Sequence, residues 1–465
     1  MKKILRVYIN DIIEAECVCG ESVYQVLADN GFALLGHCNG NAFCKKCYVE
    51  IEEQIESEQK RKKVLACEYL ICKPINIYTG ENWKQLDKNG NQQKKNIVIK
   101  KEVQDKSMAI GVAVDVGSTT IGISCIDLKT KKEFVSFSFF NPQYLYGADV
   151  ISRIQFCIEQ EEQQILLKNV LNEKIQKELK QVLGDNYACI QKIVYSGNTT
   201  MQHILRDLPV NGLAHAPFKP VNLEYVKEDN GKIEQIYPPG FSAFVGADIL
   251  VGAAYLNMGK EQTYDLLIDL GTNGEMLLLN QQSGFATSTA CGPVFDSVSE
   301  GAVYGSEMIH AMATCIKRHL IDASGMIVSP FFEKGIEIDK GFVIRQENVR
   351  NFQLAKGAIY SGIYCLMEQA GITLSDIGKV YISGGLGFYL QIRDAVTVKM
   401  LPKEFIHKAQ ISGNTSLEGA KQLVIASDSD ESWLAECERI KRRTISFELA
   451  NHVSFQKRYM QSLGF

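Results

Sequence analysis

Two segments of the chain share one plan, in which an apolar strand leads into a tight turn that starts with Asp-x-Gly and a second apolar strand follows. The copies lie about 154 residues apart, and their turn residues are Asp115, Gly117, Ser118, Thr119 and Thr120 in the first and Asp269, Gly271, Thr272 and Asn273 in the second. Each copy opens a region where long apolar strands alternate with helical patterns, which predicts an α/β domain. The internal repeat predicts a duplicated fold of two halves with a cleft between them.

The residues of both turns favour phosphate binding. Backbone N–H groups and hydroxyls at a tight turn form a concave site for an anion. An aspartate beside such a turn can hold a hydrated Mg²⁺, which prefers oxygen ligands and keeps several waters. We therefore predict that Asp115 and Asp269 face one another across the cleft and clamp a metal–triphosphate.

A third motif is the strand and glycine-rich turn that contains Gly384, Gly385 and Gly387. Glycines there would let a base or ribose approach the backbone. Another small-residue turn follows a strand at 194–201, where a plain helix cap by Ser196 or Asn198 is an equally good interpretation. Each motif alone is weak, because short Asp-Gly and Gly-Gly turns are common, but their order and spacing together indicate a nucleotide site.

Cysteines are concentrated at the N-terminus, where seven of the 14 lie in the first 72 residues. Cys38, Cys44 and Cys47 have the spacing C-x5-C-x2-C, and Cys67 follows in the segment Leu-Ala-Cys-Glu. Four thiolates are what a [2Fe–2S] cluster requires. The sequence therefore predicts these four cysteines as the ligands of such a cluster.

Two alternatives stay open for these cysteines. A zinc site built from the pairs Cys44/Cys47 and Cys67/Cys72 would leave Cys38 unused. Cys72 also competes with Cys67 as the fourth cluster ligand. Cys17 and Cys19 are interpreted as ordinary buried or surface thiols.

The predicted organisation has three parts. Residues 1–80 form the cysteine-rich unit, with a hairpin over 3–19, a helix over 22–30 capped by Ser22, and a strand over 48–51. Residues 81–107, rich in lysine, glutamine and asparagine, are predicted to be a linker. Residues 108–465 form the α/β domain, with halves of about 108–262 and 263–465.

Composition excludes some classes of partner. The formal net charge is −4, so nucleic acid is not an expected partner. No apolar stretch approaches the roughly 20 residues that span a bilayer, and the N-terminus lacks the pattern of a secretory signal. We expect a cytoplasmic protein with no membrane contact.

The order of hairpin, helix and cysteine loop resembles the β-grasp [2Fe–2S] ferredoxins, and the Leu-Ala-Cys context of Cys67 is similar to that family. The three nucleotide motifs resemble those of the sugar-kinase/Hsp70/actin superfamily, whose fold is a pair of ribonuclease-H-like subdomains. Segments such as 141–154, 196–201, 245–248, 291–295 and 413–417 extend the resemblance. Over about 110–425 the chain resembles the reductive activators of corrinoid-dependent methyltransferases.

That resemblance implies a function. Such proteins use ATP and Mg²⁺ to return cob(II)alamin on a corrinoid protein to cob(I)alamin, taking the electron from a [2Fe–2S] cluster that a reduced donor recharges. A homodimer is left open. The alternatives are a small-molecule kinase, for which Asp248 and Glu275 are the candidate bases, an electron-transfer activator of another metalloenzyme, and a binding scaffold with a structural cluster.

Overall fold

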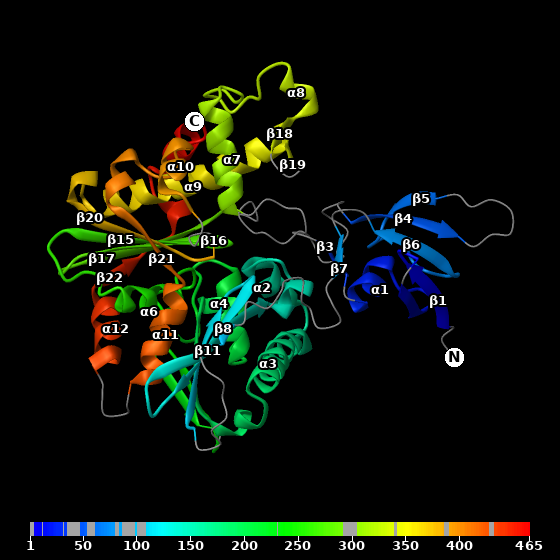
Figure 1. Cartoon of the computed structure of the whole chain (residues 1–465), viewed down its shortest axis with the longest axis horizontal. Helices are drawn as coiled ribbons and strands as arrows, with labels where there is room; N and C mark the ends of the chain where they lie inside the picture. The colour runs from blue at the N-terminus through cyan, green and yellow to red at the C-terminus, as the bar shows by residue number, and fades with distance from the viewer. Residues whose placement is uncertain are drawn as a thin grey trace.

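The computed structural model describes residues 4–11, 13–30, 32–34, 47–53, 61–79, 83–85, 98–99, 108–229, 231–291, 305–338, 342–385, 390–426 and 432–465. They form an N-terminal module and a larger α/β body (Figure 1). Among the described helices, none is both long and apolar enough to cross a bilayer.

The N-terminal module is built on a five-stranded sheet in the order β2-β1-β6-β4-β5. Its elements are β1 (Ile4–Ile9), β2 (Ile13–Val18), α1 (Val23–Asp29), β4 (Tyr48–Glu53), β5 (Arg61–Leu65) and β6 (Ile75–Thr79). Alternate residues of β1 face the core, which is why Leu5, Val7 and Ile9 are buried. Ser22 Oγ accepts a hydrogen bond from Gln25 N at 3.1 Å. The predicted hairpin, capped helix and following strand are confirmed.

The segment 81–107, predicted to be a linker, contains two short strands that pair with the parts on either side of it. Its first part holds β7 (Trp83–Gln85), which pairs with β3 (Phe32–Leu34) of the N-terminal module. The Trp83 side chain is buried, and its Nε1 donates to Tyr48 O at 3.1 Å. Further along, β8 (Val98–Ile99) pairs with the edge of the body's first sheet. Polar composition concealed these strands because strand pairing uses backbone groups.

The first sheet of the body has the order β13-β14-β12-β9-β10-β11-β8. Its longer strands are β9 (Ile110–Val116), β10 (Thr120–Asp127), β11 (Lys132–Phe140), β12 (Ile190–Gly197), β13 (Val226–Asp229) and β14 (Glu234–Tyr237). The helices α2 (Val150–Glu159) and α3 (Glu161–Leu183) lie between β11 and β12 in the chain, and α4 (Thr199–Leu205) and α5 (Asn211–Ala214) lie between β12 and β13. Apolar residues of α3, including Leu171 and Ile175, bury one face of this sheet.

The second sheet has the order β21-β20-β15-β16-β17-β22. Its strands are β15 (Tyr264–Leu270), β16 (Asn273–Leu279), β17 (Gly284–Ala290), β20 (Ile377–Ser383), β21 (Ala409–Gly413) and β22 (Thr444–Ser446). The other elements of this region are α7 (Gly305–Lys317), α8 (Phe331–Lys334), β18 (Ile336–Ile338), β19 (Phe342–Ile344), α9 (Gln346–Ala370), α10 (Ile392–Thr397), α12 (Ser432–Arg443) and α13 (Phe455–Gln461).

Both sheets contain the same sequence of pairings. In the first, β9, β10 and β11 are antiparallel neighbours, and β9 pairs in parallel with β12, which pairs in parallel with β14. In the second, β15, β16 and β17 are antiparallel neighbours, and β15 pairs in parallel with β20, which pairs in parallel with β21. The Asp-x-Gly turns therefore occupy equivalent places, between the first and second strands of each sheet.

Two helices each pack against the sheet that is formed mainly by the other half of the chain. The helix α6 (Ala247–Tyr255) precedes the second sheet in the chain and packs against it, with Ile249 beside Leu267 and Leu277 in one apolar cluster. The helix α11 (Thr415–Ile425) follows most of the second sheet but packs against the first, where Val424 joins Ala113 in another cluster. A division of the body at 262/263 therefore does not separate it into two halves in space.

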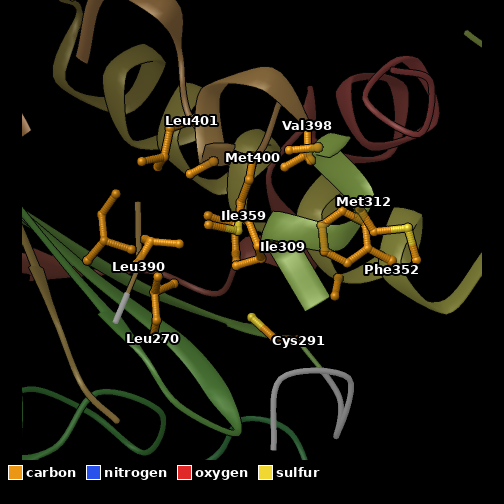
Figure 2. Packing of buried hydrophobic residues seen from close by; sticks show 14 of the residues in the cluster. Leu270, Cys291, Ile309, Met312, Phe352, Ile359, Leu390, Val398, Met400 and Leu401 are labelled. Atoms are coloured by element: carbon orange, nitrogen blue, oxygen red, sulfur yellow. The ribbon is translucent and has the colours of Figure 1, made fainter. Parts of the chain in front are cut away.

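Figure 2 shows the largest apolar cluster, in which Ile309 and Met312 of α7 and Phe352 and Ile359 of α9 pack beside Leu270 of β15. All five side chains are at most 1% exposed. One face of the second sheet therefore packs on a dense apolar core. This packing fixes the position of β15, the strand that contains Asp269.

We expect Phe352→Ala to lower the free energy of unfolding by about 3–5 kcal/mol, because it removes a buried aromatic ring and leaves a cavity. Leu354 lies on the same helix but is 47% exposed, so Leu354→Ala is the matched control and should cost about 0.5 kcal/mol or less. Urea unfolding of both variants measures the difference. Equal losses would show that the packing of α9 is not what stabilises this core.

Candidate nucleotide site

The two Asp-x-Gly turns meet. Ser118 Oγ, in the first turn, donates a hydrogen bond to Thr272 Oγ1 in the second at 3.1 Å. Thr119 Oγ1 lies 3.0 Å from the same Thr272 oxygen. Strand ends of two separate sheets thus bring the hydroxyls and backbone of the two turns together.

Asp115 and Asp269 come directly before these turns, at the ends of β9 and β15. Asp115 accepts hydrogen bonds from Asn414 Nδ2 and Ser416 Oγ, both at 2.7 Å. Asp269 accepts one from Ser383 Oγ at 2.5 Å, because β20 pairs in parallel with β15 and places Ser383 in register with it. Each carboxylate is therefore oriented by neutral donors, which leaves its negative charge uncompensated.

Asp248 and Glu275 add two more carboxylates to this site. Asp248 lies in the first turn of α6, and Glu275 on β16 stands in register with Asp269. The sequence named both only as candidate bases of a kinase and did not place them beside Asp115 and Asp269. The missed signal was the register of the hairpin, which sets Glu275 opposite Asp269.

Burial and mutual repulsion raise the pKa values of these carboxyl groups. Burial, with the charge of Asp269 next in importance, raises the pKa of Asp248 to about 7. Burial also raises the pKa of Asp269 to about 6, against the hydrogen bond from Ser383 and assisted by the charge of Asp115. The pKa of Glu275 is raised by burial and then by Asp248 and Asp269, and that of Asp115 by burial. A divalent cation with its waters would relieve this repulsion.

The glycines of the motifs allow close approach at two points. Gly384 has φ +87°, and a Cβ there would lie 2.7 Å from Asp269 Oδ1. A Cβ on Gly117 would lie 2.5 Å from Thr120 O within its own turn. Gly385 has open space around its Cα, as a surface that faces a ligand requires, and the predicted Gly387 lies outside the described residues.

Two buried polar side chains fix the first turn from behind. Asn141 Nδ2 donates to Gly117 O at 2.8 Å. Arg153 is fully buried, and it donates to Ser118 O at 2.5 Å and to Gly147 O at 2.9 Å. Burial lowers the pKa of Arg153 to about 10, so it stays protonated at neutral pH. Neither residue was assigned a role from the sequence, although a lone arginine just inside an amphipathic helix is an available signal.

The structure also brings two of the predicted cluster cysteines together. Cys47 Sγ and Cys67 Sγ lie 3.0 Å apart, and Cys67 N lies 3.4 Å from Cys47 Sγ. Both follow from the pairing of β4 with β5, which sets the residues just outside the strands side by side. Cys72 is exposed, and Cys38 and Cys44 lie outside the described residues.

A different group of metal-type side chains lies at the far end of α9. Ligand atoms of Cys365, Glu368 and His452 are within 4.8 Å of one another. The guanidinium of Arg458 already forms an ion pair with Glu368. That positive charge opposes a cation, so we interpret this group as an ion-pair network that joins α9 to α13.

Comparison with known proteins agrees with this geometry. A family described as the RACo middle region matches residues 110–261, and one described as the C-terminal domain of RACo, the ASKHA domain, matches residues 297–465. The chain belongs to the RACo family, the reductive activators of corrinoid proteins. This confirms the family resemblance that the sequence indicated, and the body is a mixed α/β structure with an actin-like ASKHA domain.

Two characterised relatives are similar over most of the chain. The corrinoid activation enzyme RamQ of Eubacterium limosum is 27% identical over 426 residues, which cover 76% of this chain and 70% of RamQ. The [Co(II) methylated amine-specific corrinoid protein] reductase of Methanosarcina barkeri is 24% identical and covers 68% of this chain and 70% of its own. A solved reductive activator for corrinoid, iron-sulfur protein has the same fold, with a TM-score of 0.69, 21% identity, and coverage of 99% of this chain and 98% of its own.

The raised pKa of Asp248 gives a prediction for stability. The folded state holds a proton on Asp248 up to about pH 7, whereas the unfolded chain loses it near its ordinary value of 3.8, so stability falls as pH rises between the two. Asp248→Asn removes this contribution while keeping an oxygen for the hydrogen bond from its neighbour Ile249 N. Without metal or nucleotide, we expect the variant to be more stable than the parent at pH 8, by at least about 1 kcal/mol, and less so at pH 5.

Urea unfolding at the two pH values measures this difference. Asp229→Asn, a change at an exposed carboxylate on β13, is the control and should follow the parent at both. Parallel pH profiles for Asp248→Asn and the parent would contradict the assignment of Asp248 to a repelling cluster.

Proposed function

We propose that this protein is an ATP-dependent reductive activator. It regenerates cob(I)alamin from cob(II)alamin on a corrinoid protein by delivering one electron, and it acts in the cytoplasm with a separate reduced donor. Support comes from the RACo family and from the named activities of the relatives, a corrinoid activation enzyme and a corrinoid protein reductase. The observation that carries the proposal is the meeting of the two turns at Thr272, with Asp115 and Asp269 beside it.

In the nucleotide site, the two turns, the two aspartates and the glycines have separate roles. Backbone N–H groups and hydroxyls of 117–120 and 271–273 bind the phosphates, and the two aspartates hold a hydrated Mg²⁺. Gly384 and Gly385 form the wall that the adenosine approaches. The donor set fits the ion, because Mg²⁺ takes carboxylate and water oxygens and the four carboxylates repel one another without it. The matched strand orders support a duplicated ribonuclease-H-like fold that closes on the nucleotide.

We assign electron transfer to the N-terminal module. Its parallel pairing of β1 with β6 and its helix α1 support a β-grasp ferredoxin fold. The Cys47 and Cys67 thiols face one another, which fits two ligands of a [2Fe–2S] cluster. We assign the other two ligands to Cys38 and Cys44, which lie outside the described residues. Bound there, such a cluster supplies one electron at a potential near −400 mV, as plant-type clusters do.

ATP has a physical purpose in such a protein. Moving an electron uphill by about 100 mV costs roughly 2.3 kcal/mol. Closure of the body around the nucleotide can favour one state of the corrinoid partner over another, by as much as its differential affinity for the two. We therefore assign the body the task of changing how the corrinoid is held and the N-terminal module the task of delivering the electron.

The fourth ligand is tested by a matched pair of variants. Cys67→Ser should abolish the ferredoxin-like visible absorption and lower the bound iron, because its thiol faces Cys47. Cys72→Ser, at an exposed thiol in the same segment, should leave both at the parental level. Loss of absorption in Cys72→Ser with retention in Cys67→Ser would reverse the assignment.

The coupling to ATP is tested at Asp269. Asp269→Asn should lower ATP-dependent reduction of a cob(II)alamin protein by about 100-fold or more, because the metal loses a charged ligand, and should leave the cluster spectrum unchanged. The measurement is anaerobic mixing with reductant, ATP and a corrinoid protein, followed by the cob(I)alamin absorption. Parental rates in Asp269→Asn would contradict its role at the metal.

A further inference from the structure

Asp115 is held by residues that lie almost 300 positions further along the chain. Asn414 and Ser416, at the start of α11, donate one hydrogen bond each to its two carboxylate oxygens, Oδ2 and Oδ1. Asp269 is held differently, by Ser383 on the neighbouring strand of its own sheet. The orientation of Asp115 therefore depends on where a helix sits, whereas that of Asp269 depends on strand pairing alone.

Both donors have their directions fixed by a second bond. Asn414 is the N-cap of α11, and its Oδ1 accepts from Leu417 N at 2.8 Å, which turns its Nδ2 toward Asp115. Ser416 Oγ uses its only proton on Asp115, so the Ser196 hydroxyl, 2.9 Å away, must donate to Ser416. Ser196 is fully buried and Ser416 is 5% exposed, so water does not replace these bonds.

The first turns of α11 pack closely against the middle of α6. A Cβ on Gly252 of α6 would lie 2.7 Å from Thr415 Oγ1, and one on Gly419 of α11 would lie 2.4 Å from Val251 O. This close contact couples the positions of the two helices. The first turn of α6 carries Asp248, another carboxylate of the candidate site.

We propose that Asn414 and Ser416 are positioning residues that hold Asp115 in the orientation in which it binds the metal of the metal–nucleotide, so that metal binding is linked to the place of the α6–α11 pair. This inference rests on the proposed nucleotide function and extends it. The pair packs on both sheets, α6 on the second and α11 on the first. Metal binding at Asp115 therefore depends on the position of the helix pair that packs on both sheets.

Four single variants of the full chain separate this role from a general effect on the fold. Ser416→Ala removes the donor to Asp115, and Ser416→Thr keeps a hydroxyl. Asn414→Ser keeps an N-cap side chain but loses the Nδ2 donor. Lys421→Gln is the control on the same helix, because Lys421 forms its ion pairs with Glu133 and Glu418 rather than with Asp115.

Calorimetric titration with ADP, in the presence of Mg²⁺ and then of a chelator, gives the first readout. We expect Ser416→Ala and Asn414→Ser to weaken binding of ADP with Mg²⁺ by about tenfold or more, since a hydrogen bond to a charged group is lost. Binding without Mg²⁺ should stay within about twofold of the parent. Ser416→Thr and Lys421→Gln should match the parent in both conditions.

Amide hydrogen exchange gives the second readout. Mg²⁺ with ADP should slow exchange at 415–420 in the parent and in Lys421→Gln, and should have little effect there in Ser416→Ala. Unchanged Mg²⁺-dependent affinity in Ser416→Ala and Asn414→Ser, or an equal loss with and without Mg²⁺, overturns the positioning role while the nucleotide function stands. If the parent itself shows no Mg²⁺-dependent ADP binding, both proposals fail together.

Discussion

The mutual repulsion of four carboxylates is the main physical constraint on this structure. These groups lie at the ends or starts of separate strands and helices. Asp115, Asp248, Asp269 and Glu275 share a space where burial weakens screening, and two of them have pKa values raised to about 6 and 7. Repulsion of this kind costs stability in the absence of a counter-charge. A divalent cation would relieve this repulsion, so the arrangement suits a metal-bound ligand.

The surrounding structure holds these charges in place without neutralising them. Hydroxyl and amide donors orient Asp115 and Asp269, while the buried Arg153 donates to the backbone carbonyl of Ser118 and to neutral neighbours rather than to these carboxylates. The positive charge therefore lies behind the first turn rather than among the carboxylates. Rigid sheets with helices on both faces supply the strand ends, and the α6–α11 pair links them.

The N-terminal module is the smaller part of the structure and brings two of the candidate cluster cysteines together. Its core is small, but pairing of β4 with β5 is enough to set the Cys47 and Cys67 thiols face to face. The β3–β7 pair extends this module past the predicted boundary, and β8 ties the chain to the body's first sheet.

The sequence by itself determined the chemistry. Asp-x-Gly turns between apolar strands are recognisable locally, so Asp115 and Asp269 could be named as candidates, and the family resemblance that the sequence indicated is confirmed. The contact between the two turns was seen only in the structure. The strands and capped helix of the first module followed from alternation and from Ser22. The places of Asn414 and Ser416 beside Asp115, of Asp248 among the carboxylates, and of α6 and α11 on exchanged sheets were decided only by tertiary structure. No local pattern encodes a contact across 300 residues, because it depends on how two sheets and a helix pair pack together.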